Sequence, residues 1–278
     1  MPSHFSQIEK SGERPGWLYD AHCHYQDSRL RSWFAERGQG LEGLGIRKAV
    51  VNGTKPGDWA DVKLMASKYE YVIPSYGLHP WFVDDGYAEA VRELEALLAD
   101  APFPIGEIGL DRWVQNYDVE LQKKAFVSQL RLAKLNQVPV TIHCLRAWGM
   151  LLETLQEEEP LESGFLLHSY GGPAEMVSAF LEIGAYFSMS GYFAIEEKRR
   201  KREAFKAVPL SRLLVETDCP DMLGPESVCP NRLGNQVNLP SNLEGVYEFA
   251  AGFYGLPSLE FRDAVEANFI QLFGRWVR

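Results

Sequence analysis

Short apolar runs alternate with longer amphipathic stretches along nearly the whole chain. In the stretch 121–136, Leu121, Ala125, Leu132 and Leu135 recur at helical spacing. Such alternation is typical of βα units, whose strands pair in parallel. Eight runs have the length and composition of strands: 17–22, 48–52, 71–76, 103–107, 138–143, 164–168, 185–189 and 213–217.

Eight strands that alternate with eight helices favour a closed barrel over an open sheet. We therefore predict an α/β fold of the (β/α)8 TIM-barrel type, with a doubly wound α/β sheet as the alternative. The chain has 278 residues, which suits one such barrel. We expect a single barrel domain over 17–278, after a polar leader over 1–16 that lacks the apolar core of a signal peptide.

Two local signals concern the C-terminal part of the chain. The segment 223–240 contains several glycines and prolines, so it predicts an irregular loop after the eighth strand, at the catalytic rim. Ser241 and Glu244 have the spacing of a capping box and predict a helix start.

Charge and cysteine usage limit the classes of function. The net charge of −10 argues against extensive non-specific binding of duplex nucleic acid, although it is compatible with a nucleic-acid substrate held at one site. No segment predicts a membrane span. The four cysteines show no CxxC spacing, and without an export signal we expect reduced thiols and a cytoplasmic protein.

Histidines and carboxylates gather where the predicted strands end. Because parallel barrel strands open at one mouth, residues far apart in sequence can meet there around one ion or two. Imidazole and carboxylate suit zinc, manganese or iron, and magnesium where carboxylates and waters dominate. The candidates are His22, His24, Glu107, His143, His168 and Asp218.

Taken singly, most of these residues have an ordinary structural explanation. A lone histidine at a strand end is more often hydrogen-bonded than metal-bound, and Asp218 could cap a turn. His22 and His24 form a stronger signal, since strand alternation points both to one side while Cys23 points away. The complete set at five strand ends predicts a metal site.

The same alternation nominates supporting residues. Asp20 lies two residues before His22, and Glu216 lies two before Asp218. Either could accept a hydrogen bond from a ligating imidazole. A salt bridge inside the barrel explains them equally well.

From about Tyr19 onward the chain resembles the TatD-like metal-dependent nucleases, a family related to the amidohydrolases. The resemblance rests on seven motifs: DAHCH, GLHPW, GEIGLD, VTIHC, LLHSYGG, LVETDCP and the final ANFIQLFG. It implies a distorted TIM barrel and hydrolysis of phosphodiesters in DNA, commonly exonucleolytic and sometimes also in RNA. It further implies one or two divalent ions held by the six candidates above, with Glu107 as a bridge.

The chain departs from the usual family pattern after strands six, seven and eight. Its sixth-strand motif reads HSYGG, the lysine that commonly follows SG at the seventh strand is missing, and no RNEP follows the eighth. The resemblance therefore supports the metal centre more strongly than it supports the residues that bind the substrate.

Hydrolysis of a phosphodiester requires a group that accepts a proton and groups that bind the phosphate. Asp218 is the best candidate to take a proton, and with Glu107 it completes our catalytic pair. Arg112 and Arg146 follow strand ends and could reach phosphate, as could His79, for which a structural role in a turn is equally open.

Other residues near the rim are candidates for contact with nucleic acid. The basic run 198–202 is more typical of a solvated helix face than of a phosphate site, because neighbouring glutamates dilute it. Base stacking is conceivable for four aromatic residues, with a core role as the default: Trp81, Trp113, Tyr170 and Tyr192.

The sequence leaves three candidate functions. The favoured one is a deoxyribonuclease acting as an exonuclease on single-stranded DNA, or also on RNA, with magnesium, manganese or zinc. The alternative is a small-molecule metallohydrolase of the lactonase, phosphotriesterase or amidohydrolase type. An inactive scaffold is disfavoured by the intact ligand set.

Overall fold

The computed structural model describes residues 16–37, 41–115, 118–158, 160–234 and 236–277. The predicted polar leader falls, apart from Gly16, outside these residues. The division into a leader and one domain therefore stays a prediction.

Eight parallel strands lie in sequence order, and each overlaps one of the eight predicted runs. β4 and β5 begin and end later in the chain than predicted, while β3, β6 and β8 are shorter. The strands are β1 (Leu18–Cys23), β2 (Ile46–Asn52), β3 (Val72–Ser75), β4 (Ile105–Asp111), β5 (Val140–Leu145), β6 (Phe165–Leu167), β7 (Ala185–Met189) and β8 (Leu213–Val215).

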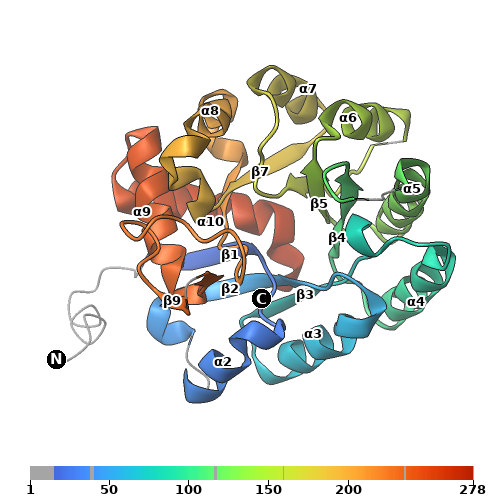
Figure 1. Cartoon of the computed structure of the whole chain (residues 1–278), viewed down its shortest axis with the longest axis horizontal. Coiled ribbons are helices and arrows are strands. Elements are labelled where there is room, and N and C mark those ends of the chain that lie inside the picture. The colour runs from blue at the N-terminus through green and yellow to red at the C-terminus, as the bar shows by residue number, and fades with distance from the viewer. Residues whose placement is uncertain (1–15, 38–40, 116–117, 159, 235, 278) are drawn as a thin grey trace.

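Helices follow every strand and surround the strands on the outside (Figure 1). The helix predicted over 121–136 is confirmed as α5. The helices are α2 (Arg31–Arg37), α3 (Pro56–Lys68), α4 (Tyr87–Asp100), α5 (Val119–Asn136), α6 (Trp148–Glu157), α7 (Val177–Glu182), α8 (Arg199–Arg202), α9 (Leu243–Tyr254) and α10 (Ser258–Phe273).

The strands form a distorted (β/α)8 barrel, as predicted. They pair as two sheets, β1-β2-β3 and β4-β5-β6-β7-β8, without the reversal of strand order that a doubly wound sheet requires. Between the sheets, the Gly106 amide donates to the Tyr76 carbonyl at 3.0 Å. On the other side, the Asp218 amide donates to the His22 carbonyl at 3.0 Å, so the last strand returns to the first.

Irregular strand pairing accounts for much of the distortion. The register shifts between Asp20 and Cys23 in β1, and between Ile105 and Ile108 in β4. His22 and Glu107 lie inside these two shifts. Such irregularities redirect side chains and are frequent beside active sites.

Asp20 holds the first strand to the last, and among the described residues it makes neither of the two contacts that the sequence left open, support of an imidazole or a salt bridge. Its carboxylate accepts hydrogen bonds from the Thr217 amide (2.9 Å), the Thr217 hydroxyl (2.6 Å) and the Tyr25 hydroxyl (2.8 Å). The register shift after Asp20 breaks the simple alternation on which the prediction depended. α10 covers this junction, since it contacts both β1 and β8.

The segment after β8 is an irregular loop, as expected, with one two-residue ribbon of β9 (Arg232–Leu233) and β10 (Val237–Asn238). The Asn238 amide group donates to the Thr217 carbonyl at 2.9 Å, which anchors the loop beside the end of β8.

The predicted capping box at Ser241 is wrong. α9 begins at Leu243 after a 3-10 turn over Pro240–Asn242, and the Asn242 side chain donates to the Asn231 carbonyl at 2.6 Å instead of capping the helix. In the part of the chain that is described, no helix is long and apolar enough to cross a membrane.

Gly109 allows β4 and β5 to approach each other. Its φ is +149°, and a Cβ there would lie 1.9 Å from the His143 carbonyl oxygen. Gly109→Ala should therefore lower the free energy of unfolding by at least about 2 kcal/mol, as measured by urea denaturation.

Gly252 provides the matched control, because a Cβ on this exposed α9 residue meets no atom within 4 Å. Gly252→Ala should be neutral or stabilising by up to about 1 kcal/mol. Equal stability of the two variants would contradict our explanation of the β4–β5 contact.

Candidate metal centre

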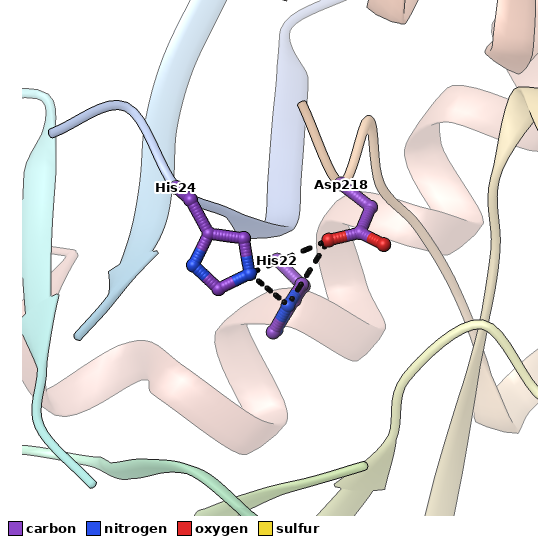
Figure 2. Close-up of side chains that lie close together, drawn as sticks. All are labelled: His22, His24 and Asp218. Carbon is purple, nitrogen blue, oxygen red and sulfur yellow. Dashed lines mark hydrogen bonds and ion pairs between the residues drawn. The ribbon is translucent and has the colours of Figure 1, made fainter. Parts of the chain in front are cut away.

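The six predicted ligands converge at the carboxyl ends of the strands. Figure 2 shows His22, His24 and Asp218 pointing toward one another from the ends of β1 and β8. Glu107 lies in β4 and His143 in β5, and His168 directly follows β6. The strand order thus gathers residues separated by almost 200 positions.

One group of donors forms around His22. Its Nε2 lies 3.2 Å from His24 Nε2 and 3.3 Å from Asp218 Oδ1. Glu107 Oε2 is 3.6 Å from the same His22 nitrogen and 3.3 Å from His24 Nε2. Two imidazoles and two carboxylates therefore face a common point.

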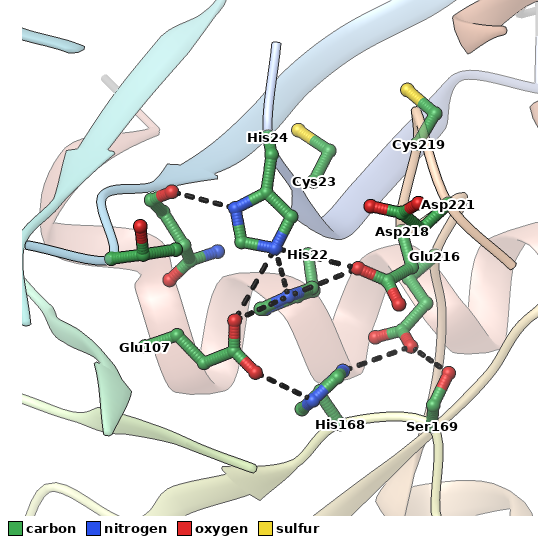
Figure 3. Close-up of polar contacts among 12 residues, drawn as sticks. His22, Cys23, His24, Glu107, His168, Ser169, Glu216, Asp218, Cys219 and Asp221 are labelled. Carbon is green, nitrogen blue, oxygen red and sulfur yellow. Dashed lines mark hydrogen bonds and ion pairs between the residues drawn. The ribbon is translucent and has the colours of Figure 1, made fainter. Parts of the chain in front are cut away.

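The other oxygen of Glu107 faces a second group. Oε1 lies 2.9 Å from His168 Nε2 and 3.0 Å from His143 Nδ1, and these two nitrogens are 3.2 Å apart. Figure 3 shows Glu107 between His24 and His168, with one oxygen turned to each side. A single buried carboxylate is therefore shared by both donor groups.

This donor set fits divalent metal ions. Three groups of donors have ligand atoms within 4.8 Å of one another: His22/His24/Asp218, His22/Glu107/His168 and His79/Glu107/His143. Facing imidazole nitrogens 3.2 Å apart cannot both carry a hydrogen without repulsion, whereas two lone pairs directed at one cation are favourable. Nitrogen and carboxylate oxygen together are ligands for zinc or manganese.

Hydrogen bonds outside the donor groups fix which imidazole nitrogen faces inward. His24 Nδ1 donates to the Asn52 carbonyl at 2.8 Å, and His143 Nε2 donates to Asp111 Oδ2 at 2.9 Å. In neutral rings the inward nitrogens then carry lone pairs, which is the state that binds a metal.

Glu216 lies beside His168, at ion-pair distance and without the hydrogen bond that the sequence suggested. Its Oε1 is 3.5 Å from His168 Nδ1 and also accepts from the Ser169 hydroxyl at 2.5 Å, while Oε2 accepts from the Ser188 hydroxyl. The serine hydroxyls hold this buried carboxylate in place (Figure 3 labels Ser169).

Sequence reasoning gave no role to Asp111 or Asn52. Asp111 could have been found, since it is a carboxylate at the end of the strand that carries Glu107. Asn52 acts through its backbone carbonyl, for which no residue type is a signal.

Burial and neighbouring charges shift the acid groups in opposite directions. Burial raises the pKa of Asp218 to about 6, although His168 and His24 oppose the rise. For Asp111, burial alone would raise the pKa, but hydrogen bonds from His143 and Trp81 lower it to about 2. Asp218 is thus the more basic carboxylate of the two.

His79 is buried beside the centre, with its Nε2 3.3 Å from Glu107 Oε1. Its Nδ1 accepts a hydrogen bond from the Trp81 amide at 3.2 Å, so in the neutral ring Nε2 carries the hydrogen. This arrangement makes His79 a hydrogen-bond donor toward the centre.

Arg112 and Arg146 are exposed where β4 and β5 end, outside the buried donor groups. Among the aromatic candidates, Tyr170 is fully buried, which agrees with the core role expected by default and leaves it no surface for base stacking. Trp81 and Trp113 expose about half of their surface, at 50% and 54%.

Three residues at strand ends adopt left-handed backbone conformations: Arg146 (φ 57°), Ser169 (φ 40°) and Asp218 (φ 51°). Such conformations cost residues other than glycine about 1 kcal/mol or more and cluster at functional sites. Ser169 directly follows His168, and Asp218 is itself one of the donors.

Known proteins resemble the whole chain. The metal-dependent hydrolase YcfH of Escherichia coli K12 is 29% identical over 262 residues, which cover 92% of this chain and 96% of YcfH. The 3'-5' ssDNA/RNA exonuclease TatD of Citrobacter rodentium is 30% identical over 241 residues, or 83% of this chain and 88% of TatD. The crystal structure of YjjV, a TatD homologue from E. coli K12, has a TM-score of 0.84 at 26% identity and covers 92% of this chain and 98% of YjjV.

Fold, donor set and relatives together define a metal-dependent hydrolase that cleaves ester bonds. More narrowly, the chain belongs to the TatD related DNase family, whose sequence model matches residues 19–274.

The Asp111 hydrogen bonds lead to a prediction about metal affinity. The carboxylate accepts from His143 Nε2 and Trp81 Nε1 on one oxygen and from the Trp113 amide on the other. In Asp111→Asn, the side-chain amide would place an N–H group against one of these donors. The hydrogen bond that positions His143 would then be weakened. Affinity for zinc or manganese should fall by about 10- to 100-fold in calorimetric titration.

Asp263→Asn, an exposed change on α10, serves as the control and should bind metal like the wild type. Unchanged affinity in a folded Asp111→Asn protein would show that His143 needs no support from Asp111.

Proposed function

We propose that this protein is a divalent-metal-dependent nuclease that removes nucleotides from an end of single-stranded DNA, and also of RNA. The observation that carries the proposal is the Glu107 carboxylate, whose two oxygens face two separate groups of donors. Paired metal sites of this kind are common in enzymes that hydrolyse phosphodiesters. The 30% identity to an enzyme named as a 3'-5' ssDNA/RNA exonuclease supports the same substrate.

The ligand roles in the proposal follow the two donor groups. His22, His24 and Asp218 would hold one ion, and His143 and His168 the other, with Glu107 between them. Magnesium, manganese and zinc are all compatible with one or both positions. When bound, such an ion would polarise the phosphoryl group and lower the pKa of water.

Asp218 is the proposed general base. It lies three residues after the end of β8, its carboxylate lies 3.3 Å from His22 Nε2, and burial raises its pKa to about 6. A carboxylate with a pKa near neutrality accepts a proton from water more readily than an ordinary one. Glu107, whose pKa is held low by the surrounding histidines against the effect of burial, is better suited to remain charged.

Three further side chains would contact the phosphate. His79 Nε2 can donate to a phosphoryl oxygen beside Glu107. Arg146 and Arg112, both exposed at the rim, can neutralise charge that develops on the reacting diester.

The depth of the donors favours single strands. His22 is fully buried, and Glu107 and Asp218 are nearly so. A loose strand end can enter the barrel mouth, whereas a stacked duplex backbone stays outside. We also assign the protein to the cytoplasm, because all four cysteines are buried and unpaired as they would be under reducing conditions.

A substrate panel tests the proposal. With manganese, magnesium or zinc added, end-labelled single-stranded DNA should be degraded faster than blunt duplex, and chelation should abolish the reaction. Equal cleavage of duplex interiors would contradict the single-strand specificity. Turnover of a lactone or phosphotriester without nuclease activity would support a small-molecule metallohydrolase instead.

Asp218→Asn separates catalysis from folding. Turnover should fall by about a hundredfold or more, because the amide cannot take a proton, while the thermal unfolding temperature changes little. Excess metal should restore little of the rate if Asp218 is the base and much of it if Asp218 is only a ligand.

Asp221→Asn removes an equal charge three residues further on, from an exposed ion pair with Arg29, and should leave turnover within about twofold. A folded, metal-loaded Asp218→Asn protein with wild-type activity would refute the role of Asp218.

A further inference from the structure

A groove of about 990 Å³ lies at the carboxyl ends of β4 to β7, beside the metal centre. The segments after β4 and β5 contribute Trp113, Arg146 and Trp148 to its lining. The segment after β7 contributes Tyr192, Lys198, Arg200, Lys201, Glu203 and Ala204. The turn that follows β6, at 171–175, completes the lining. We call this feature the basic groove.

The charge of the basic groove is opposite to that of the whole protein. Four basic side chains line it, against two acidic ones, while the chain as a whole carries −10. One of the acids, Glu203, is already paired with Lys206 at 2.5 Å. The basic side chains are Arg146, Lys198, Arg200 and Lys201. A local positive surface on an acidic protein attracts a polyanion to that place only.

The run 198–202 divides into two faces, which the sequence did not reveal. Arg199 points to Glu196 at 3.8 Å, and Arg202 donates to the Phe193 carbonyl at 2.7 Å. Arg200 and Lys201 instead line the groove, and within the described part of the chain neither has a carboxylate within 4.0 Å. Both residues are exposed, as expected for a solvated helix face, and they also line the groove.

Small residues bring Lys201 close to the end of β6. A Cβ on Gly171 would lie 3.7 Å from Lys201 Nζ, so the ammonium group lies against the turn three residues after His168. Lys198 Nζ lies 4.6 Å from the centre of the Tyr192 ring. Both ammonium groups thus face the groove near strands that also carry the metal donors.

Trp113 contributes an aromatic surface to the groove from the segment that follows β4. It exposes 54% of its surface, although a tryptophan of this size is usually buried to a larger extent. Its amide donates to Asp111 Oδ1 at 2.6 Å, and the other oxygen of that carboxylate holds His143. One residue therefore connects the wall of the groove to the metal centre.

We propose that the basic groove binds the single-stranded polynucleotide beyond the scissile bond. Arg146 contacts the reacting phosphate at the edge of the groove, Arg200 and Lys201 contact the phosphates beyond it, and a base stacks on Trp113. Cationic side chains with an exposed aromatic ring are the combination by which proteins hold single strands without sequence preference. The volume is at the upper end of small-ligand pockets, about 300–1,000 Å³, and exceeds what the reacting diester alone requires. This assignment rests on the proposed nuclease function.

The test compares two double variants that remove the same charge. Arg200→Ala/Lys201→Ala removes the two cations that α8 contributes to the lining of the groove. Arg199→Ala/Lys124→Ala removes two exposed cations outside it, on α8 and α5. Both proteins are assayed with single-stranded DNA and RNA oligonucleotides of increasing length, and by fluorescence anisotropy with a labelled oligonucleotide in the presence of chelator.

The groove variant should raise the KM for a long oligonucleotide by about tenfold or more, with an effect that shrinks as the substrate is shortened to a dinucleotide. The dependence of log Kd on log salt should fall by about 1.4, at about 0.7 for each lost phosphate contact. Trp113→Ala should weaken anisotropy binding by about 5- to 100-fold. The control variant should match the wild type in every assay.

Equal behaviour of the groove and control variants would overturn the assignment of the groove, as would a loss of duplex binding as large as the loss of single-strand binding. Failure of the nuclease proposal gives a different result, because the wild type then cleaves no nucleic acid of any length. The anisotropy measurement in chelator still decides whether the groove binds single strands in that case.

Discussion

The buried Glu107 carboxylate is the interaction on which the centre depends. Five of the six histidines in the chain lie within 3.6 Å of its two oxygens: His22, His24, His79, His143 and His168. A carboxylate removed from water is costly unless it is paired, and the imidazoles supply those partners while they lower its pKa. The donors come from five different strands, so the barrel has to close before the group can exist.

The close approach of strands around Glu107 is made possible by glycine. A Cβ on Gly106 would lie 2.8 Å from both Asn52 Oδ1 and Thr141 Cβ, and Gly109 permits the contact with β5 described above. On the far side, Asp20 closes the β1–β8 junction directly below His22 and Asp218. Rigid strands and buried hydrogen bonds therefore fix the donors, which reduces the reorganisation required when an ion or substrate binds.

The metal centre and the basic groove are built from two different kinds of structure. Donors inside the mouth are buried or partly buried, and they lie against Asp111, Asn52 and Glu216, none of which is exposed. The groove is built from strand-end loops and α8, where cations and an exposed tryptophan remain available. Loops at the carboxyl face of a barrel vary without loss of the core, which explains how a shared metal centre can be combined with a chain-specific substrate surface.

The sequence by itself determined the order of eight strands and helices and the residues at the strand ends, because hydrophobic periodicity and motif spacing are local properties. It also nominated Glu216, since alternation holds within β8 and its extension. It failed for Asp20, where a register shift in β1 breaks alternation, and for Ser241, where Asn242 is engaged by Asn231 across the loop. Only the tertiary structure decided that Glu107 faces two donor groups, that Asp111 and the Asn52 carbonyl orient imidazoles, and that the basic run has two faces. Each of these depends on contacts between segments that are distant in the chain, and such contacts exist only when the barrel is closed.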